Sequence, residues 1–387
     1  MPWNNLPKLH LCGKALHPII QGGMGVGISA HRLAGTVARH GAIGTIASID
    51  LRRHHPDLMA QTERCRDQVK IEQANLVALD REIKAAKVIA DGNGLIAVNT
   101  MRAVTQYTDY VRQACRSGAD AIVMGAGLPL DLPDLTADWP HVALIPILSN
   151  SRGVALLLKK WQRRRRLPDA IVIEHPGYAG GHLGAAQLDE FQAPQFNFSN
   201  VLQEIFQIFD EAGIERKQIP IILAGGIHSH EQICQLLALG ASAVQIGTPF
   251  AVTEEGDAHL TFKKVLAEAR PEDIVTFMSV AGLWARAVLT PWLKNYLQRE
   301  DKLRASATPE RGRCTLAWDC LIQCGLRDGN PNAGQFCIDQ QLAAALKGDL
   351  SKGLFFRGSE PLPFGSAIRP VHELLEYFLT GIRPVQI

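Results

Sequence analysis

The sequence lacks long hydrophobic runs and lacks an excess of charge of either sign. No apolar stretch approaches the ~20 residues that span a bilayer, so we expect no membrane-spanning segment. The 40 Lys and Arg residues are balanced by 38 Asp and Glu residues, and the net charge of +2 predicts no nucleic acid as partner. The polar start MPWNNLPKLH does not resemble a signal peptide. The sequence therefore predicts a cytoplasmic protein with a small-molecule substrate.

The length and composition are those of a globular protein. The chain has 387 residues, of which 47% are hydrophobic and 20% charged. This length suits one (β/α)8 barrel of about 250 residues and an appended region.

The stretch Ile219–Phe250 reads as a strand, a helix and a second strand. Ile219–Ala224 and Ala243–Ile246 are short apolar runs, as expected for strands that are buried on both faces. Ser229, followed three residues later by Gln232, predicts the start of the helix between them.

Each of these strands ends in a glycine turn. Gly225 and Gly226 follow the first strand, and Gly247 and Thr248 follow the second. Two adjacent turns of exposed backbone N–H groups can bind a phosphate, and such sites follow the last two strands of many barrels. The alternative is that these glycines only permit tight turns.

Short apolar runs of this kind alternate with helical patterns along the chain. The predicted strands are Pro18–Gln21, Ala42–Ala47, Leu95–Val98, Ala121–Met124, Leu144–Leu148, Ala170–Glu174, Ile219–Ala224 and Ala243–Ile246. This alternation predicts an α/β fold, a (β/α)8 TIM barrel over residues 1–270 with a helical insertion at about 50–93. Residues 271–387 form a C-terminal helical and loop extension that contains cysteines and packs on the barrel.

A glycine-rich loop, GGMGVG, follows the first strand, and Ser29 is expected to cap the helix after it. A dinucleotide-binding turn would need an acidic residue at the end of the second strand, where Ser48 and Ile49 precede Asp50. We interpret the loop as backbone that lies against a flat ligand over the barrel mouth. A glycine-rich loop without a ligand is the alternative.

A second informative loop, HPGYAGGHLG, begins at His175 after the sixth strand. Glycines, a proline and two histidines build structure poorly, and they gather in the active-site loops of barrels.

These motifs together resemble a known family. PIIQGGMG, LDREIKAAKVIADGNGLIAVN, AGGHLG, ILAGGI and QIGTPF are similar, in order and spacing, to segments of the nitronate monooxygenases. Their superfamily also includes FMN-dependent enoyl-ACP reductases and NADH:quinone reductases. The resemblance covers roughly Pro18–Phe250, with a weaker echo in GLFFRGSEPLPFG.

The resemblance implies FMN at the barrel mouth. Its phosphate would lie on Gly225, Gly226, Gly247 and Thr248. The rest of the implied pocket comprises Gly22, Gly23 and Met24 at the isoalloxazine ring, Asn99 at the ring or ribityl chain, and Gly180 and Gly181 beyond them. His182 matches the active-site histidine of the family, a base that takes or orients the α-proton of the substrate. A histidine bonded to loop backbone is the alternative.

One loop departs from the family pattern. Members commonly carry Gln-Gly-x-Glu-Ala-Gly-Gly-His, whereas this chain has His175, Pro176, Gly177 and Tyr178 before AGGH. The departure alters the shape and polarity of the substrate side of the pocket.

Four of the eight cysteines, Cys314, Cys320, Cys324 and Cys337, lie within 24 residues of the C-terminal region. Iron–sulfur clusters take four thiolates at such loose spacings, so the pattern favours a [4Fe–4S] cluster, with zinc or no metal as alternatives. A cluster beside FMN would suit a reductase that receives electrons from NAD(P)H or a redox protein.

The sequence therefore favours an FMN-dependent oxidoreductase that oxidises a nitronate-like carbon acid with oxygen. One alternative is an NAD(P)H-dependent quinone or enoyl reductase that uses FMN and an iron–sulfur cluster. A second is a non-redox barrel enzyme with a phosphorylated substrate, and a third is a flavin-holding interaction protein. A purine-nucleotide dehydrogenase is disfavoured because the loops after strands six to eight carry no cysteine nucleophile.

Overall fold

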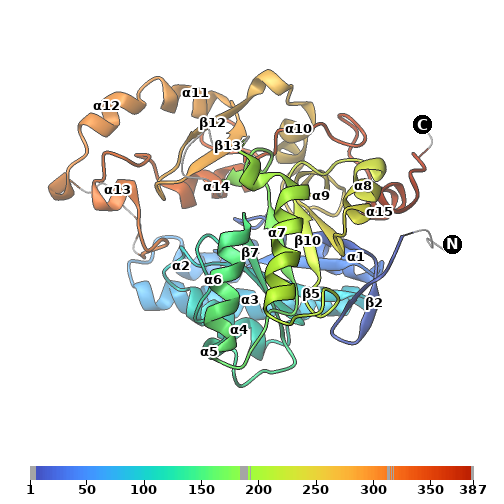
Figure 1. The fold of residues 1–387 in the computed structure, drawn as a ribbon. Coiled ribbons are helices and arrows are strands. Elements are labelled where there is room, and N and C mark those ends of the chain that lie inside the picture. The colour runs from blue at the N-terminus through green and yellow to red at the C-terminus, as the bar shows by residue number, and fades with distance from the viewer. Residues whose placement is uncertain are drawn as a thin grey trace.

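The fold is a closed barrel of eight parallel strands, as predicted (Figure 1). The computed structural model describes residues 6–183, 191, 193–311, 314, 316 and 318–384. The barrel strands are β3 (Ile19–Gln21), β4 (Ile43–Ala47), β5 (Leu95–Met101), β6 (Ala121–Gly125), β7 (Ala143–Leu148), β8 (Ile171–Glu174), β10 (Ile221–Ala224) and β11 (Ala243–Ile246). Each corresponds to one predicted strand, and β11 pairs with β3 to close the barrel.

The barrel is filled with apolar side chains at one end and open at the other. Alternate residues of the strands, such as Val172 on β8 and Ile222 on β10, form a luminal cluster. The hairpin of β1 (Leu9–Leu11) and β2 (Lys14–Leu16) adds its leucines to that cluster. The lumen is therefore a packed core, and a ligand can bind only at the carboxyl ends of the strands.

Helices surround the barrel. They are α1 (His31–Arg39), α2 (Pro56–Thr62), α3 (Gln68–Ala90), α4 (Tyr107–Arg116), α5 (Leu132–Leu135), α6 (Ser151–Gln162), α7 (Phe198–Glu211), α8 (His230–Ala238) and α9 (Thr248–Ala251), with 3-10 turns η1 (Leu51–His54) and η3 (Pro194–Phe196). Ser229 accepts the N–H of Gln232 at 3.2 Å, which confirms the predicted start of α8. Within the predicted insertion, α3 buries one face against α1 and serves as the crossover from β4 to β5.

The extension lies over the open end of the barrel, where Figure 1 shows it in orange and red. The helix α10 (Leu260–Glu268) precedes it, and its elements are η4 (Pro271–Asp273), β12 (Ile274–Met278), β13 (Trp284–Val288), α11 (Pro291–Leu297), α12 (Glu300–Ala305), η5 (Pro309–Arg311), α13 (Gly325–Asp328), α14 (Ile338–Leu346) and α15 (Val371–Thr380). In addition to the predicted helices and loops it contains two strands. β13 pairs with β12 on one side and, on the other, with β9 (Gly181–His182) from the loop after β8, so barrel and extension share one sheet.

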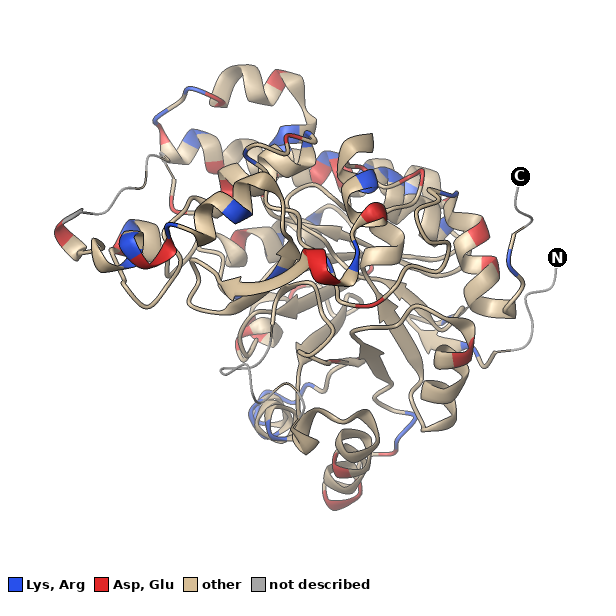
Figure 2. Cartoon of the chain, turned by 90° about the horizontal axis from the view of Figure 1, so that it is seen from above, with Lys and Arg blue, Asp and Glu red and all other residues tan. Residues whose placement is uncertain are grey.

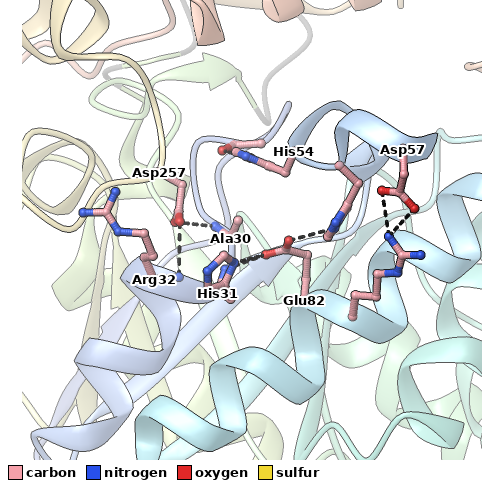
Figure 3. A network of polar contacts seen from close by, with 10 residues as sticks. Ala30, His31, Arg32, His54, Asp57, Glu82 and Asp257 are labelled. Carbon is pink, nitrogen blue, oxygen red and sulfur yellow. Dashed lines mark hydrogen bonds and ion pairs between the residues drawn. The ribbon is translucent and has the colours of Figure 1, made fainter. Parts of the chain in front are cut away.

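The N-terminus of α1 is capped by carboxylates from distant segments (Figure 3). Asp257 accepts the backbone N–H of Ala30 at 2.8 Å and of Leu33 at 3.2 Å. The Glu82 Oε2, from α3, accepts the backbone N–H of His31 at 2.8 Å. The same oxygen lies 2.7 Å from the Nδ1 of the His31 ring. Sequence rules for helix caps consider only residues next to the helix start. They cannot reveal these caps, because the donors and acceptors are far apart in the sequence.

Ser29, in contrast, does not cap α1, and that prediction was wrong. The cap position is Ala30, which makes no side-chain hydrogen bond. The Ser29 Oγ instead accepts the N–H of Met24 at 2.8 Å, within the glycine-rich loop. Ser29 therefore fixes the loop that borders the barrel mouth.

Charged residues of both signs are interspersed over the outer elements (Figure 2). This distribution agrees with the balanced composition of the chain. Among the described residues, no helix is both long and apolar enough to cross a membrane.

Candidate active site

The barrel mouth opens into a cavity of about 750 Å³ between the strand ends and the extension. All ten residues predicted to bind the cofactor line this cavity, together with His182. They are Gly22, Gly23, Met24, Asn99, Gly180, Gly181, Gly225, Gly226, Gly247 and Thr248. The structure thus brings together residues from five separate parts of the sequence.

The two glycine turns after β10 and β11 present backbone N–H groups to the cavity. The N–H groups of Gly225, Gly226, Gly247 and Thr248 have no hydrogen-bond acceptor within the described part of the chain. Gly225 and Gly226 have φ of 103° and 75°, which favours glycine. A Cβ on Gly247 would have only the Met24 Sδ, at 3.8 Å, within contact distance. The turns therefore leave both donors and room for an anion.

The first glycine loop packs tightly on strand β5. A Cβ on Gly23 would lie 2.3 Å from the Cβ of Asn99, so only glycine fits there. The Asn99 Nδ2 donates to the Val123 carbonyl at 3.4 Å, which is a long hydrogen bond. The amide of Asn99 thus retains capacity for a ligand at the barrel mouth.

The segment after Leu354 closes the cavity from the extension. The backbone of Arg357 and Gly358 lies against Gly180, where a Cβ would be 2.6 Å away. The Gly358 N–H donates to the Thr248 Oγ1 at 3.1 Å. The segment GLFFRGSEP, which has the weaker similarity to the family, therefore forms part of the cavity wall.

His182 lies in the short strand β9 and is held by the extension. Its Nε2 is 2.9 Å from the Oγ of Ser279, which follows β12, and the ring of Phe356 packs on it with 5.7 Å between centroids. Burial lowers the pKa of His182 to about 4, so the imidazole is neutral at pH 7. It can accept a proton or orient a polar group, and Ser279 fixes its ring.

Three residues of this cavity region were not predicted as site residues. Glu174 and Gln245 line the cavity from β8 and β11, and Ser279 reaches His182 from the extension. Burial raises the pKa of the Glu174 carboxyl to about 7. Glu174 and Gln245 could have been found from the alternation of luminal residues along their strands, whereas nothing in the sequence links Ser279 to His182.

The cysteine prediction has weaker support. The eight cysteines are free thiols, and Cys320 is buried in the cavity wall. Burial raises the pKa of Cys337 to about 12, with smaller contributions from Asp339, Cys314 and Cys324, so these groups lie in one region. However, no three His, Cys, Asp or Glu side chains in the described ranges are arranged to hold a metal ion. The described part of the chain therefore gives no support for an iron–sulfur or zinc site, and the cluster stays a prediction.

The fold and the cavity at its C-terminal face define a (β/α)8-barrel enzyme. The family model for nitronate monooxygenase matches residues 8–380, and the chain belongs to that family. It is therefore a flavin-dependent oxidoreductase, which disfavours the non-redox barrel and the interaction protein among the predicted alternatives.

Named relatives agree with this assignment. A probable nitronate monooxygenase of Bacillus subtilis is 28% identical over 296 residues, which are 74% of this chain and 80% of the relative. One from Staphylococcus saprophyticus is 23% identical over 305 residues, covering 74% and 79% of the two chains.

Solved structures show the same fold. FabK from Thermotoga maritima superposes with a TM-score of 0.63 and 22% identity, covering 94% of this chain and 91% of that one. Nitroalkane oxidase from Streptomyces ansochromogenes gives a TM-score of 0.60 and 18% identity, with 94% of each chain covered.

Proposed function

We propose that the chain binds FMN at the barrel mouth and oxidises a nitronate-like carbon acid with oxygen. The observation that carries the proposal is the pair of glycine turns after β10 and β11, whose four backbone N–H groups lack an acceptor among the described residues. A phosphate bound there would satisfy these donors. The names of the curated relatives support nitronate as the substrate class.

One set of cavity residues would bind the cofactor, and another would contact the substrate. Gly225, Gly226, Gly247 and Thr248 would hold the phosphate, and Gly23 and Met24 would lie against the isoalloxazine ring. Bound FMN would supply a two-electron acceptor that reacts with oxygen. The close approach of Gly23 to Asn99 fixes the loop against β5, so its backbone would form one wall of the ring site.

His182 would act on the substrate. Its imidazole is neutral at pH 7 and fixed by Ser279, so it can accept a hydrogen bond or proton from the carbon acid. Leu183, Leu283 and Phe356 line the same cavity and would exclude water from the reacting atoms.

A reductase is the second candidate, and a specific residue favours it. Tyr178 lines the cavity where the family pattern has glutamate, so an aromatic phenol takes the place of a carboxylate beside the substrate. A reductase of a quinone or enoyl group would take electrons from NAD(P)H. Anaerobic bleaching of the yellow protein by NADH would support the reductase, whereas bleaching by a nitronate alone would support the monooxygenase.

The [4Fe–4S] cluster stays a separate prediction. The position of Cys320 in the cavity wall supports it, and the lack of a gathered thiol group in the described residues weighs against it. Iron and acid-labile sulfide, measured on anaerobically purified protein, test it directly. Four of each per chain would support a [4Fe–4S] cluster, and none of either would refute it.

Substitution of Gly247 tests the phosphate site. An alanine there has φ of −105° and meets only the Met24 Sδ, so the apo protein should melt at the wild-type temperature. The added methyl group enters the cradle, and we expect the FMN dissociation constant to rise at least tenfold. The proposed function would be refuted if the wild-type protein purifies colourless and does not bind added FMN.

A further inference from the structure

Glu174 is a carboxyl group inside the barrel mouth. It is the last residue of β8, in which Val172 belongs to the luminal cluster, as does Ala170 just before the strand, while Ile171 and Ile173 belong to the outer core that packs on the helices. Because side chains alternate along a strand, Glu174 points into the barrel above Val172. It lines the cavity at the open end.

This carboxyl has no hydrogen-bond or ion-pair partner among the described residues. None of the side-chain hydrogen bonds or ion pairs of the described residues involves the Glu174 carboxyl, and its partner on the neighbouring strand β10 is the apolar Ala224. Burial alone raises its pKa to about 7. An unpaired carboxyl in such surroundings costs stability, so packing alone does not account for a glutamate above Val172.

A second unpartnered polar group lies on the same row of the barrel. Ala224 of β10 pairs with Glu174 on one side and with Gln245 on the other. Gln245 is 8% exposed, and its Oε1 has no hydrogen-bond partner in the described structure. The methyl group of Ala224 leaves space between the two longer side chains.

These two residues and Asn99 form the polar part of the uppermost luminal layer. Asn99 extends from β5, across the barrel, above the luminal residue Ala97. A flat ring placed over the mouth would rest on this layer. Its carbonyl and ring-nitrogen atoms need donors, and its N–H group needs an acceptor.

We propose that Glu174, with Gln245 beside it, hydrogen-bonds the flavin ring, and that the carboxyl binds in its protonated form. This inference rests on the proposed FMN site. The protonated carboxyl donates to an acceptor atom of the ring, and the Gln245 Oε1 accepts from a ring N–H. Ionisation of Glu174 removes the donor and places a negative charge under the ring.

Other ionisable groups also border the cavity. They are Tyr178, His182, His228, Cys320, Asp339, Arg357 and Glu360. None of them contributes a charge interaction to the raised pKa of Glu174, since burial is the one cause of that shift. The comparison of Glu174 variants at each pH isolates its contribution from theirs.

The test is the pH dependence of FMN binding to apo protein, followed by quenching of flavin fluorescence. Between pH 6 and pH 8.5 the wild-type dissociation constant should rise by roughly 3- to 30-fold relative to that of Glu174→Gln. The amide of Glu174→Gln keeps a donor but does not titrate. Glu268→Gln, the same change at an exposed position of α10, should follow the wild type.

A spectroscopic titration gives an independent readout. The visible flavin bands of the wild type should shift with a midpoint near pH 7 that Glu174→Gln lacks. Identical titrations and identical pH profiles of binding in the two proteins would overturn the proposal. Failure of both proteins to bind FMN would instead refute the proposed function, so the two failures can be told apart.

Discussion

Single residues in the cavity owe their chemistry to burial. His182 and Glu174 lie near each other in the sequence, at the two ends of one loop, and burial acts on them in opposite senses. It lowers the pKa of the imidazole to about 4 and raises that of the carboxyl to about 7, because burial disfavours the charged form of each group. Both groups border the proposed ring site: the imidazole is neutral at pH 7, and the carboxyl changes its protonation state near that pH.

The raised pKa of Glu174 predicts a stability effect in the apo protein. Since the folded state binds the proton more tightly than the unfolded state, stability falls as pH rises from about 4.5 through about 7. The loss is at most about 3 kcal/mol above that range. Glu174→Gln should therefore melt a few degrees above wild type at pH 8.5 and at the same temperature at pH 4.5. Calorimetry at the two pH values checks this, and an equal difference at both would contradict it.

Gly23 supports a prediction about the loop. A Cβ there would lie 2.3 Å from the Asn99 Cβ, so Gly23→Ala must displace the loop or β5. We expect a loss of about 1–3 kcal/mol in stability and a weakened FMN site. Thermal melting and FMN titration measure the two effects. Gly247→Ala is the control, because it should alter binding alone; equal effects of both variants would contradict this account.

At the scale of elements, the glycine loop depends on how α1 is anchored. Glu82 of α3 is almost fully buried, and its carboxylate oxygens lie 2.7 Å from the His31 Nδ1 (Figure 3) and 3.0 Å from the His55 Nε2. Asp257 holds the neighbouring N–H groups. The helix, and the loop that leads into it, are therefore fixed by acids from two other segments.

This network should make stability depend on pH in both directions. Hydrogen bonds from His31 and His55 hold the pKa of Glu82 below its usual range despite burial, so its contribution is present above about pH 4.5 and is lost as pH falls. The pKa of His31 is raised by its bond to Glu82, so its contribution is complete below about pH 6.5 and is lost as pH rises.

The variant Glu82→Gln tests the network. We expect it to destabilise the protein by about 2–4 kcal/mol near pH 5.5, with a smaller difference from wild type at pH 3.5 and pH 8.5. Urea unfolding at the three pH values measures this. Glu63→Gln, at an exposed site before α3, should change little. A difference that does not vary with pH would show that ionisation of the network is not involved.

At the scale of the whole molecule, the extension completes the site and then returns to the barrel wall. Its strand β13 pairs with β9, and its Ser279 Oγ lies within hydrogen-bonding distance of the His182 Nε2. Its last helix, α15, packs on α1, α8 and α9. Phe378 of α15 is fully buried and contacts the ring of Phe250, with 6.3 Å between centroids, directly behind the turn at Gly247.

Removal of the Phe378 ring should therefore affect both stability and the phosphate site. Phe378→Ala leaves a cavity in the core and should cost about 3–5 kcal/mol. It should also weaken FMN binding, because α9 loses its support. Ile382→Ala, at a residue that is 63% exposed, is the control. If the two variants melt alike, α15 does not stabilise the barrel.

The sequence by itself determined the barrel and most of its mouth. Each strand is a short apolar run that ends in glycine or a polar residue, and this local pattern survives in the fold because parallel strands are buried on both faces. The same pattern placed the glycines, Asn99 and His182 at one edge, since the carboxyl ends of all eight strands meet there.

Only the tertiary structure decided which distant groups meet. Asp257 and Glu82, in place of Ser29, accept the N–H groups at the start of α1, Ser279 is the partner of His182, and the Glu174 carboxyl has no partner within the described ranges. These outcomes depend on contacts between segments up to 227 residues apart, as between Ala30 and Asp257. Local periodicity carries no information about such distances, because the geometry of the closed barrel and its extension sets them.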